Sequence, residues 1–246
     1  MRYLFVALLF FICSISIGGT RDPNKTDDRY IDYGKKFSCV YKLRCMTNDG
    51  ILYYASAVAI DDNWILTAAH VLSNSKDTKI IIGDETINID KIITHKDFVF
   101  ANYGYYDIAL CHVEKSFDLN FYPELYTDKD ELGRVCSVSG FGYYGTFQTG
   151  AVSSDGKKRA GSNIIESIDK QILICKPSRP NDENITELEF MIANGDSGGG
   201  LFIGNKLAGI NSCVMAVDKK TDSNYDDEGC HTRISLFVDW IKSNKK

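Results

Sequence analysis

Short apolar stretches recur along most of the chain and are separated by turn-forming Gly, Asn and Asp. They occupy residues 38–43, 51–60, 64–67, 79–82, 87–94, 107–113, 134–139, 171–175, 201–203 and 206–212. Many strands of this length with turn signals between them are typical of an all-β barrel or sandwich. The pattern therefore predicts an all-β fold.

Three segments depart from that pattern. Apolar residues recur at helical spacing within 236–241, and Ser235 precedes them as an N-cap would, which predicts a short C-terminal amphipathic helix. Residues 145–163 are rich in Gly, Ser and Lys, so we expect a loop or a crossing between barrels there. Residues 176–187 form another long polar insertion.

The first residues predict export. Arg2 precedes an apolar run, 3–17, that is shorter than the roughly 20 residues a membrane-spanning helix needs. Ser16, Gly18 and Gly19 then supply the small residues that a signal peptidase needs at its cleavage site. We predict a signal peptide over 1–18 and a secreted protein, extracellular or periplasmic. An uncleaved anchor is the alternative.

The rest of the chain is expected to fold as one unit. Residues 19–29 are polar and charged, and we interpret them as a flexible leader or a propeptide. Residues 30–246 then form the folded domain. Only 4 prolines occur in the whole chain, so no Pro-rich linker divides it.

Composition narrows the class of protein. The 246 residues are 44% hydrophobic and 25% charged, which is ordinary globular composition and excludes a disordered or fibrous chain. A net charge of −5 argues against a nucleic-acid backbone as the main partner. Of 8 cysteines, Cys13 falls in the signal peptide, and the other seven are widely spaced without a CxxC pair. That spacing indicates no metal site, and an odd number leaves at least one thiol unpaired.

The segment 194–200, Asn-Gly-Asp-Ser-Gly-Gly-Gly, is the sharpest motif in the sequence. A serine between glycines has no bulky neighbour, so the Ser197 hydroxyl can be exposed while nearby backbone N–H groups converge. Gly195 and Ser197 could donate those N–H groups to a developing oxyanion. Taken alone, the segment could equally be a glycine-rich turn.

Two further residues favour a nucleophilic serine over a simple glycine-rich turn. His70 ends an apolar segment, 64–70, that runs into small residues, and imidazole is the base a serine nucleophile needs near neutral pH. Asp107 opens another apolar segment, where a partly buried carboxylate would fix the histidine tautomer. By itself, an aspartate before a strand is most often a turn residue.

The order His70, Asp107, Ser197 and the three contexts resemble the chymotrypsin/trypsin-like serine protease family over nearly the whole mature chain. The resemblance implies two six-stranded antiparallel β-barrels with the site between them and a short C-terminal α-helix. It also implies a serine endopeptidase that works through a Ser-His-Asp triad and an acyl-enzyme, with no cofactor and no metal.

By the same resemblance, the residue six positions before the nucleophile lies at the base of the pocket for the residue before the scissile bond. That residue is Met191, with Gly229 on the pocket wall and Ser212 on the adjoining strand. A methionine carries no charge, so we expect a preference for apolar residues. The acidic run 226–228 could instead favour basic residues, and His231 could favour a carboxylate, although a core role for that histidine is more common.

The sequence also departs from the family pattern. Cys213 and Cys230 would lie on neighbouring strands, so a bridge between them is conceivable, the alternative being two buried thiols. Relatives made as zymogens expose a new amine that pairs with the aspartate before the nucleophile, here Asp196. The matching start after Arg29 is bulky, so we predict activity that does not depend on cleavage there.

Two other classes deserve comparison. A non-catalytic protease-like binding module usually lacks one triad member, and here all three stand. An esterase with a Gly-x-Ser-x-Gly elbow needs the order Ser, Asp, His, and this chain has the reverse arrangement. We expect protein or peptide substrates, a protein inhibitor as a further partner, no nucleic acid, no membrane after signal removal, and a monomer.

Overall fold

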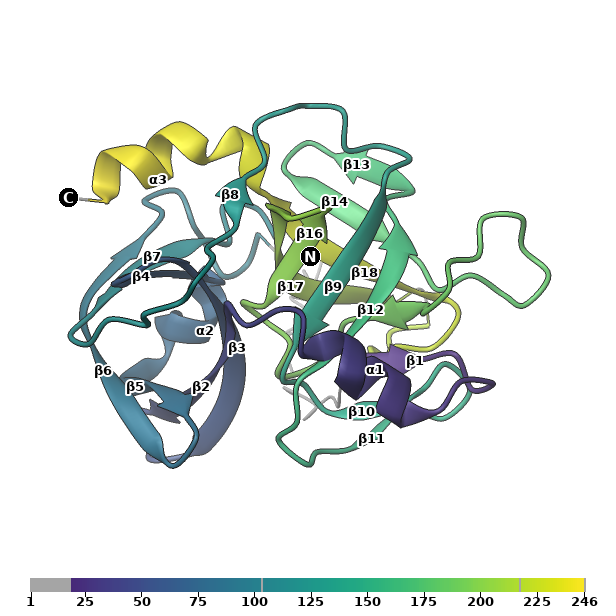
Figure 1. The fold of residues 1–246 in the computed structure, drawn as a ribbon, viewed down its shortest axis with the longest axis horizontal. Helices are drawn as coiled ribbons and strands as arrows, with labels where there is room; N and C mark the ends of the chain where they lie inside the picture. Colours follow the sequence, from purple (N-terminus) through teal and green to yellow (C-terminus); the bar gives the residue numbers. More distant parts are fainter. Residues whose placement is uncertain (1–18, 103, 217, 246) are drawn as a thin grey trace, which may run out of the picture.

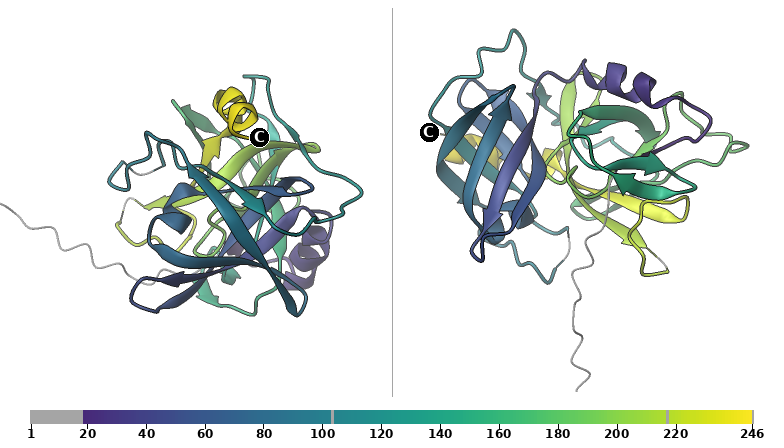
Figure 2. Two further views of the ribbon diagram at one scale, coloured as in Figure 1. Left: turned by 90° about the vertical axis from the view of Figure 1, so that its left-hand side faces the viewer. Right: turned by 90° about the horizontal axis from the view of Figure 1, so that it is seen from below.

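The computed structural model describes residues 19–102, 104–216 and 218–245. The predicted signal peptide, 1–18, lies outside the described residues. Two β-sheet bodies lie side by side, the first built from the N-terminal half and the second mainly from the C-terminal half (Figures 1 and 2). The all-β, chymotrypsin-like fold class is confirmed.

The first body is a closed barrel with strand order β2-β3-β4-β7-β6-β5. Its strands are β2 (Val40–Thr47), β3 (Leu52–Asp61), β4 (Trp64–Thr67), β5 (Ser75–Ile82), β6 (Glu85–Thr94) and β7 (Ala109–Val113). Strands that follow each other in the sequence pair antiparallel, except β4 and β5. Instead β4 pairs with β7 and β5 pairs with β2, which closes the circle. Closure leaves no unpaired sheet edge and buries a single core of aliphatic side chains.

The second body is a curled sheet with strand order β12-β9-β16-β17-β18-β14-β13, so its circle is not closed by hydrogen bonds as the first one is. Its strands are β8 (Glu124–Leu125), β9 (Val135–Gly140), β12 (Arg159–Ile164), β13 (Ser167–Asp169), β14 (Ile172–Cys175), β16 (Gly200–Ile203), β17 (Lys206–Ala216) and β18 (Asp227–Arg233). The short β8 runs parallel to the start of β17. A separate apolar core fills this sheet.

The N-terminal residues are folded, which differs from the flexible segment expected for 19–29. The strand β1 (Gly19–Arg21) lies between β10 (Tyr144–Thr146) and β15 (Phe190–Met191) in a small sheet that β11 (Gly150–Ser153) extends. The helix α1 (Asp27–Gly34) follows and packs on β12. Charge holds it there, because the buried Arg159 guanidinium binds both carboxylate oxygens of Asp27 at 2.6 and 2.8 Å.

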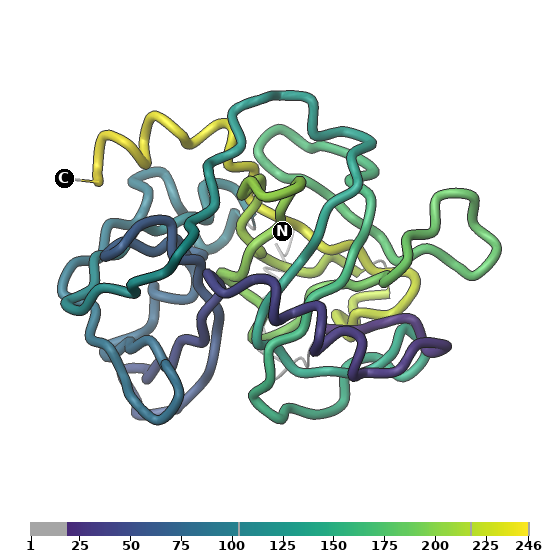
Figure 3. The backbone as a smooth tube through the Cα atoms, in the orientation of Figure 1, coloured from purple at the N-terminus to yellow at the C-terminus, as the bar shows by residue number. Residues whose placement is uncertain are grey.

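The prediction of a loop over 145–163 was wrong, because β11 falls inside this range and β12 begins inside it. The strand β12 pairs with β9 along its whole length. By contrast, the insertion 176–187 is outside all strands and projects from the second body on the side away from the first (Figure 3).

The chain ends in helical turns, as predicted. A 3₁₀ turn, η1 (Ile234–Leu236), leads into α3 (Val238–Asn244), whose apolar side chains join the core of the first barrel. The predicted cap was wrong: Phe237 occupies the N-cap, and the Ser235 hydroxyl donates to Glu131 instead. Within the described residues, no helix is long and apolar enough to cross a membrane.

Candidate active site

The first barrel brings His70 and Asp107 together. His70 lies in α2 (Ala69–Ser73), directly after β4, and Asp107 lies just before β7. Since β4 and β7 pair with Thr67 opposite Ala109, the two side chains meet at the same end of the barrel. Nδ1 of His70 donates to Oδ2 of Asp107 at 2.8 Å, and the His70 backbone N–H donates to Oδ1 at 2.9 Å.

Burial and charge act against each other in this pair. Burial disfavours the imidazolium, but the facing carboxylate outweighs it and raises the pKa of His70 above its ordinary value. Burial also disfavours the Asp107 carboxylate, yet the imidazolium and three hydrogen bonds hold the pKa of Asp107 below its ordinary value. The pair is therefore built to stabilise a protonated histidine beside an ionised aspartate.

Ser212 connects Ser197 to this pair. The Ser197 hydroxyl donates to the Ser212 carbonyl at 3.3 Å, and the Ser212 hydroxyl donates to Oδ2 of Asp107. Among the described residues, no hydrogen bond joins Ser197 to His70 directly. The sequence marked Ser212 only as part of the substrate strand, and its hold on Asp107 has no local sequence signal because the two residues are 105 positions apart.

Two backbone N–H groups in the loop that carries Ser197 have no hydrogen-bond acceptor among the described residues. Gly195 adopts a φ of +88°, which favours glycine, and its carbonyl accepts a hydrogen bond from the Ser56 hydroxyl at 2.8 Å. The Asn194 carbonyl accepts from the Tyr143 N–H at 3.1 Å. With both carbonyls turned to these donors, the N–H groups of Gly195 and Ser197 have no acceptor among the described residues. Two N–H groups without an acceptor are the kind of donor that an oxyanion would need.

The glycines after the serine are required by close packing. A Cβ on Gly198 would lie 2.1 Å from the Thr67 hydroxyl, and one on Gly199 would lie 2.3 Å from the Ser139 carbonyl. Gly198 also has a φ of +84°. The loop that carries Ser197 is thus pressed against both sheets, which excludes a glycine-rich turn that serves only as a flexible link.

The predicted pocket residues lie on two different sheets, Met191 on β15 and Ser212 and Gly229 on β17 and β18. Met191 is only 2% exposed and pairs with Thr20 of β1. A Cβ on Gly229 would lie 3.3 Å from the Ile192 side chain, so Gly229 leaves room beside an apolar wall. Ser212 and Gly229 lie on the paired strands β17 and β18.

The neighbouring acidic residues are already engaged. Asp226 forms an ion pair with Arg179 at 2.8 Å, and Glu228 forms one with Lys176 at 2.6 Å. Asp227 is buried and accepts the backbone N–H of Ser223 at 2.8 Å. Burial raises the pKa of this carboxyl to about 6. None of the three is a free counter-ion for a basic substrate side chain.

His231 is a buried core residue. Its Nδ1 lies 2.9 Å from Oδ1 of Asn211, and burial lowers its pKa to about 3, so the ring is neutral at physiological pH. The amide of Asn211 in turn donates to the carbonyls of Ser139 and Asp196, which ties β17 to the serine loop. A neutral ring is a poor receptor for a substrate carboxylate.

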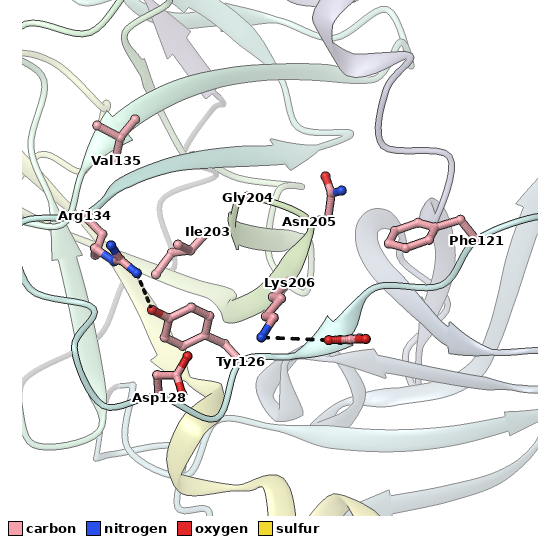
Figure 4. A pocket seen from close by; sticks show the side chains of 10 residues that line it. Phe121, Tyr126, Asp128, Arg134, Val135, Ile203, Gly204, Asn205 and Lys206 are labelled. Atoms are coloured by element: carbon pink, nitrogen blue, oxygen red, sulfur yellow. Dashed lines mark hydrogen bonds and ion pairs between the residues drawn. The ribbon is translucent and has the colours of Figure 1, made fainter.

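A groove of about 660 Å³ lies elsewhere, between β8 and the β16–β17 turn (Figure 4). Phe121, Tyr126 and Lys206 help line it, and it shares no residue with the His70, Asp107 and Ser197 group. Nor do the described ranges contain a cluster of three or more side chains suited to hold a metal ion.

A closed barrel that presents a His–Asp pair to a serine loop of the second sheet defines the class of chymotrypsin-like proteins. A model of the trypsin family, described as "Trypsin", matches residues 34–241, and the chain belongs to this family of serine endopeptidases.

Curated relatives agree with that family, and solved structures share its fold. Trypsin I-P1 of Gallus gallus is 26% identical over 207 residues, which cover 78% of this chain and 79% of the relative. Chymotrypsin-like elastase family member 1 of Macaca fascicularis is 24% identical over 74% of this chain and 75% of the relative. Among solved structures, HL collagenase superposes with a TM-score of 0.67 at 18% identity, over 85% of this chain and 94% of that one. Neuropsin from mouse brain superposes with a TM-score of 0.64 at 20% identity, over 83% of this chain and 94% of that one.

Proposed function

We propose that the protein is a secreted serine endopeptidase with Ser197 as nucleophile, His70 as general base and Asp107 as the group that orients His70. The observation that carries the proposal is the 2.8 Å bond from His70 to a buried carboxylate that Ser212 ties to the serine loop. We further propose that it cleaves after apolar residues and acts as a monomer on protein or peptide substrates.

The proposed chemistry gives each of these groups one step. His70 takes the proton of Ser197 as the hydroxyl oxygen attacks the scissile carbonyl, and Asp107 stabilises the imidazolium that forms. The open N–H groups of Gly195 and Ser197 receive the oxyanion. His70 then returns the proton to the leaving amine, and water repeats the sequence to release the acyl group.

The test replaces the nucleophile. The Ser197→Ala variant should lose about six orders of magnitude in kcat and keep only the effect of the oxyanion site and substrate binding. A serine-directed fluorophosphonate should label the wild type and leave this variant unlabelled. Ser116→Ala is the matched control, because that hydroxyl lies on the surface and bonds only to Asp118. Near-full activity in the Ser197→Ala variant would refute the assignment and favour a protease-like binding module.

A further inference from the structure

Ser212 is the extra residue of a β-bulge in β17. Asn211 and Cys213, on either side of it, pair with consecutive residues of β18, so the register shifts between them. A bulge bends its strand and re-aims a side chain, and bulges are frequent next to active sites. Here the Ser212 hydroxyl donates to Asp107, and the Ser212 carbonyl accepts from Ser197 at 3.3 Å. Both contacts therefore depend on how firmly the bulge is held.

The two sides of the bulge are held unequally. On one side the Asn211 amide donates to the carbonyls of Ser139 and Asp196 at 3.1 and 3.2 Å. The side-chain oxygen of Asn211 lies 2.9 Å from Nδ1 of His231. On the other side the Cys213 side chain offers only a thiol, which is a weak donor and a weak acceptor. A covalent link at Cys213 would hold the second side as firmly as the first.

Cys230 lies where it can supply that link, directly opposite Cys213 on β18. Cross-strand partners have Cβ atoms about 4.5–5.5 Å apart and a disulfide needs about 3.5–4.5 Å, so a slight closure of the strands is enough. The two cysteines also share a small apolar cluster with Tyr105, which lies two positions before Asp107. A bridge would thus fasten β17 beside both Ser212 and the segment that carries Asp107.

The two thiols differ in access and in acidity. Among the described residues, Cys213 is the only cysteine that is partly exposed, and Cys230 is fully buried. The Cys230 thiol donates a hydrogen bond to the Cys213 sulfur, which lowers the pKa of Cys213 and raises the pKa of Cys230 well above its ordinary value. Exposure and thiolate character together determine which thiol reacts, so Cys213 is the one that a disulfide from solution can reach. The other close pair, Cys136 and Cys175, is buried at both members.

We propose that Cys213 and Cys230 are a redox modification site for small-molecule disulfides of the glutathione type, and that closing the bridge holds Ser212 in place and raises peptidase activity. This inference rests on the proposed function. The Cys213 thiolate attacks one sulfur of the external disulfide and releases one thiolate. Cys230 then loses its proton to solvent and its sulfur attacks Sγ of Cys213, which forms the bridge and releases the second thiol. Two electrons pass from the cysteine pair to the external disulfide, which becomes two thiols.

The compartment then sets the activity. In a reducing compartment both thiols persist and Ser212 is held on one side only, so its hydrogen bonds to Ser197 and Asp107 are broken for part of the time. Disulfides form and persist in the oxidising surroundings that follow export. The peptidase would therefore reach full activity only after export.

The test follows activity through a redox titration. Purified protein is equilibrated with mixtures of reduced and oxidised glutathione. In separate samples the bridges are mapped by mass spectrometry and kcat/KM is measured for a peptide with Leu before the scissile bond. The value of kcat/KM should rise at least about tenfold as the Cys213–Cys230 bridge goes from absent to complete, because the bridge holds Ser212. Equal kcat/KM in the reduced and the bridged protein would overturn the inference.

Two variants assign the effect to one pair of cysteines. Cys230→Ala removes the buried partner and should stay at the low kcat/KM at every glutathione ratio. Cys136→Ala is the matched control, because it removes a buried thiol of the other pair and should keep the rise of about tenfold. A rise that survives in Cys230→Ala contradicts the inference. If Cys230→Ala does not fold, the absence of a rise in Cys136→Ala contradicts it as well.

Labelling by the serine-directed fluorophosphonate separates positioning from a loss of fold. The reduced protein should keep its native near-UV circular dichroism while its rate constant for labelling falls at least about tenfold. A near-UV signal lost in step with activity would show a merely structural role and refute the inference. The same reagent separates the two proposals. If the bridged protein neither cleaves peptides nor becomes labelled, the proposed function fails, whereas equal activity in the reduced and bridged forms defeats only the inference.

Discussion

Met191, Ile192 and Gly229 are the residues we propose to line the pocket for the residue before the scissile bond, and none of them carries a charge. The nearest acidic side chains are held by Arg179, by Lys176 or by backbone N–H groups. A substrate Arg would therefore lose its hydration without gaining a counter-ion, whereas an apolar side chain would gain buried contact.

This balance predicts the order of cleavage in matched peptides. Peptides with Leu or Phe before the scissile bond should be hydrolysed at least about tenfold faster than the peptide with Arg, and the same should hold against Glu. The prediction is tested by measuring kcat/KM for the four peptides with Leu, Phe, Arg or Glu before the scissile bond. Arg preferred tenfold over Leu and Phe would refute the prediction and would mean that the acidic residues 226–228 exchange their present partners for substrate.

At the scale of residues, the sequence predicts the groups that we propose to carry the chemistry, but it does not predict the residues that hold those groups in place. Residues 194–200 and the context of His70 are local patterns, so they are readable from the sequence. The contact of Ser212 with Asp107 joins residues 105 positions apart. No periodicity or spacing marks such a pair, because it is set only when the two sheets come together.

At the scale of elements, the loop that carries Ser197 depends on how closely it approaches β3 and β4 of the first barrel. Gly198 follows Ser197 and faces the Thr67 hydroxyl and the Ser56 carbonyl, with no room for a methyl group. Its N–H donates to the Asn211 carbonyl at 2.8 Å, which fixes the loop against β17 as well. The loop is therefore held from both bodies at once.

We predict that Gly198→Ala lowers the free energy of unfolding by about 3 kcal/mol or more, because overpacking adds to the strain of a positive φ. Activity should fall with it, since Ser197 must move. Gly204→Ala is the control: its φ is also positive, at +58°, but nothing lies within 4 Å of the Cβ position. That variant should lose only about 1 kcal/mol. Urea unfolding of both proteins measures the difference, and equal losses would show that the close packing contributes nothing.

The strands of the first barrel were predictable from their apolar pattern, whereas β12 was not. The strand β12 reads Arg-Ala-Gly-Ser-Asn-Ile, a polar sequence typical of a loop. It forms a strand because distant partners satisfy its side chains: Asp27 binds Arg159, Thr186 bonds Ser162, and the Phe190 carbonyl accepts from Asn163. The helix α1 was not predicted for the same reason, because it packs mainly on the distant strand β12.

On the scale of the whole molecule, the cysteines divide between the two bodies. Cys39, Cys45 and Cys111 are buried in the closed barrel, where burial raises the pKa of Cys39 and of Cys45 to about 11. The other four lie in the second sheet as two close pairs. The sulfur atoms of Cys136 and Cys175 are 3.8 Å apart. Cys213 and Cys230 are opposite each other on β17 and β18.

This division predicts two disulfides and three thiols in the exported protein. Cys136–Cys175 and Cys213–Cys230 should form under oxidising conditions, because each pair needs little movement to reach bonding geometry. Peptide mapping by mass spectrometry without reduction should show both bridges, and the thiols of the closed barrel should resist alkylation until the protein unfolds. Reduction should lower the free energy of unfolding by about 2–4 kcal/mol per bridge. Cys45→Ser serves as the control for the loss of one sulfur without a bridge. A native protein in which all seven cysteines react as free thiols after air oxidation would contradict the prediction, and it would mean that the open second sheet is held by packing alone.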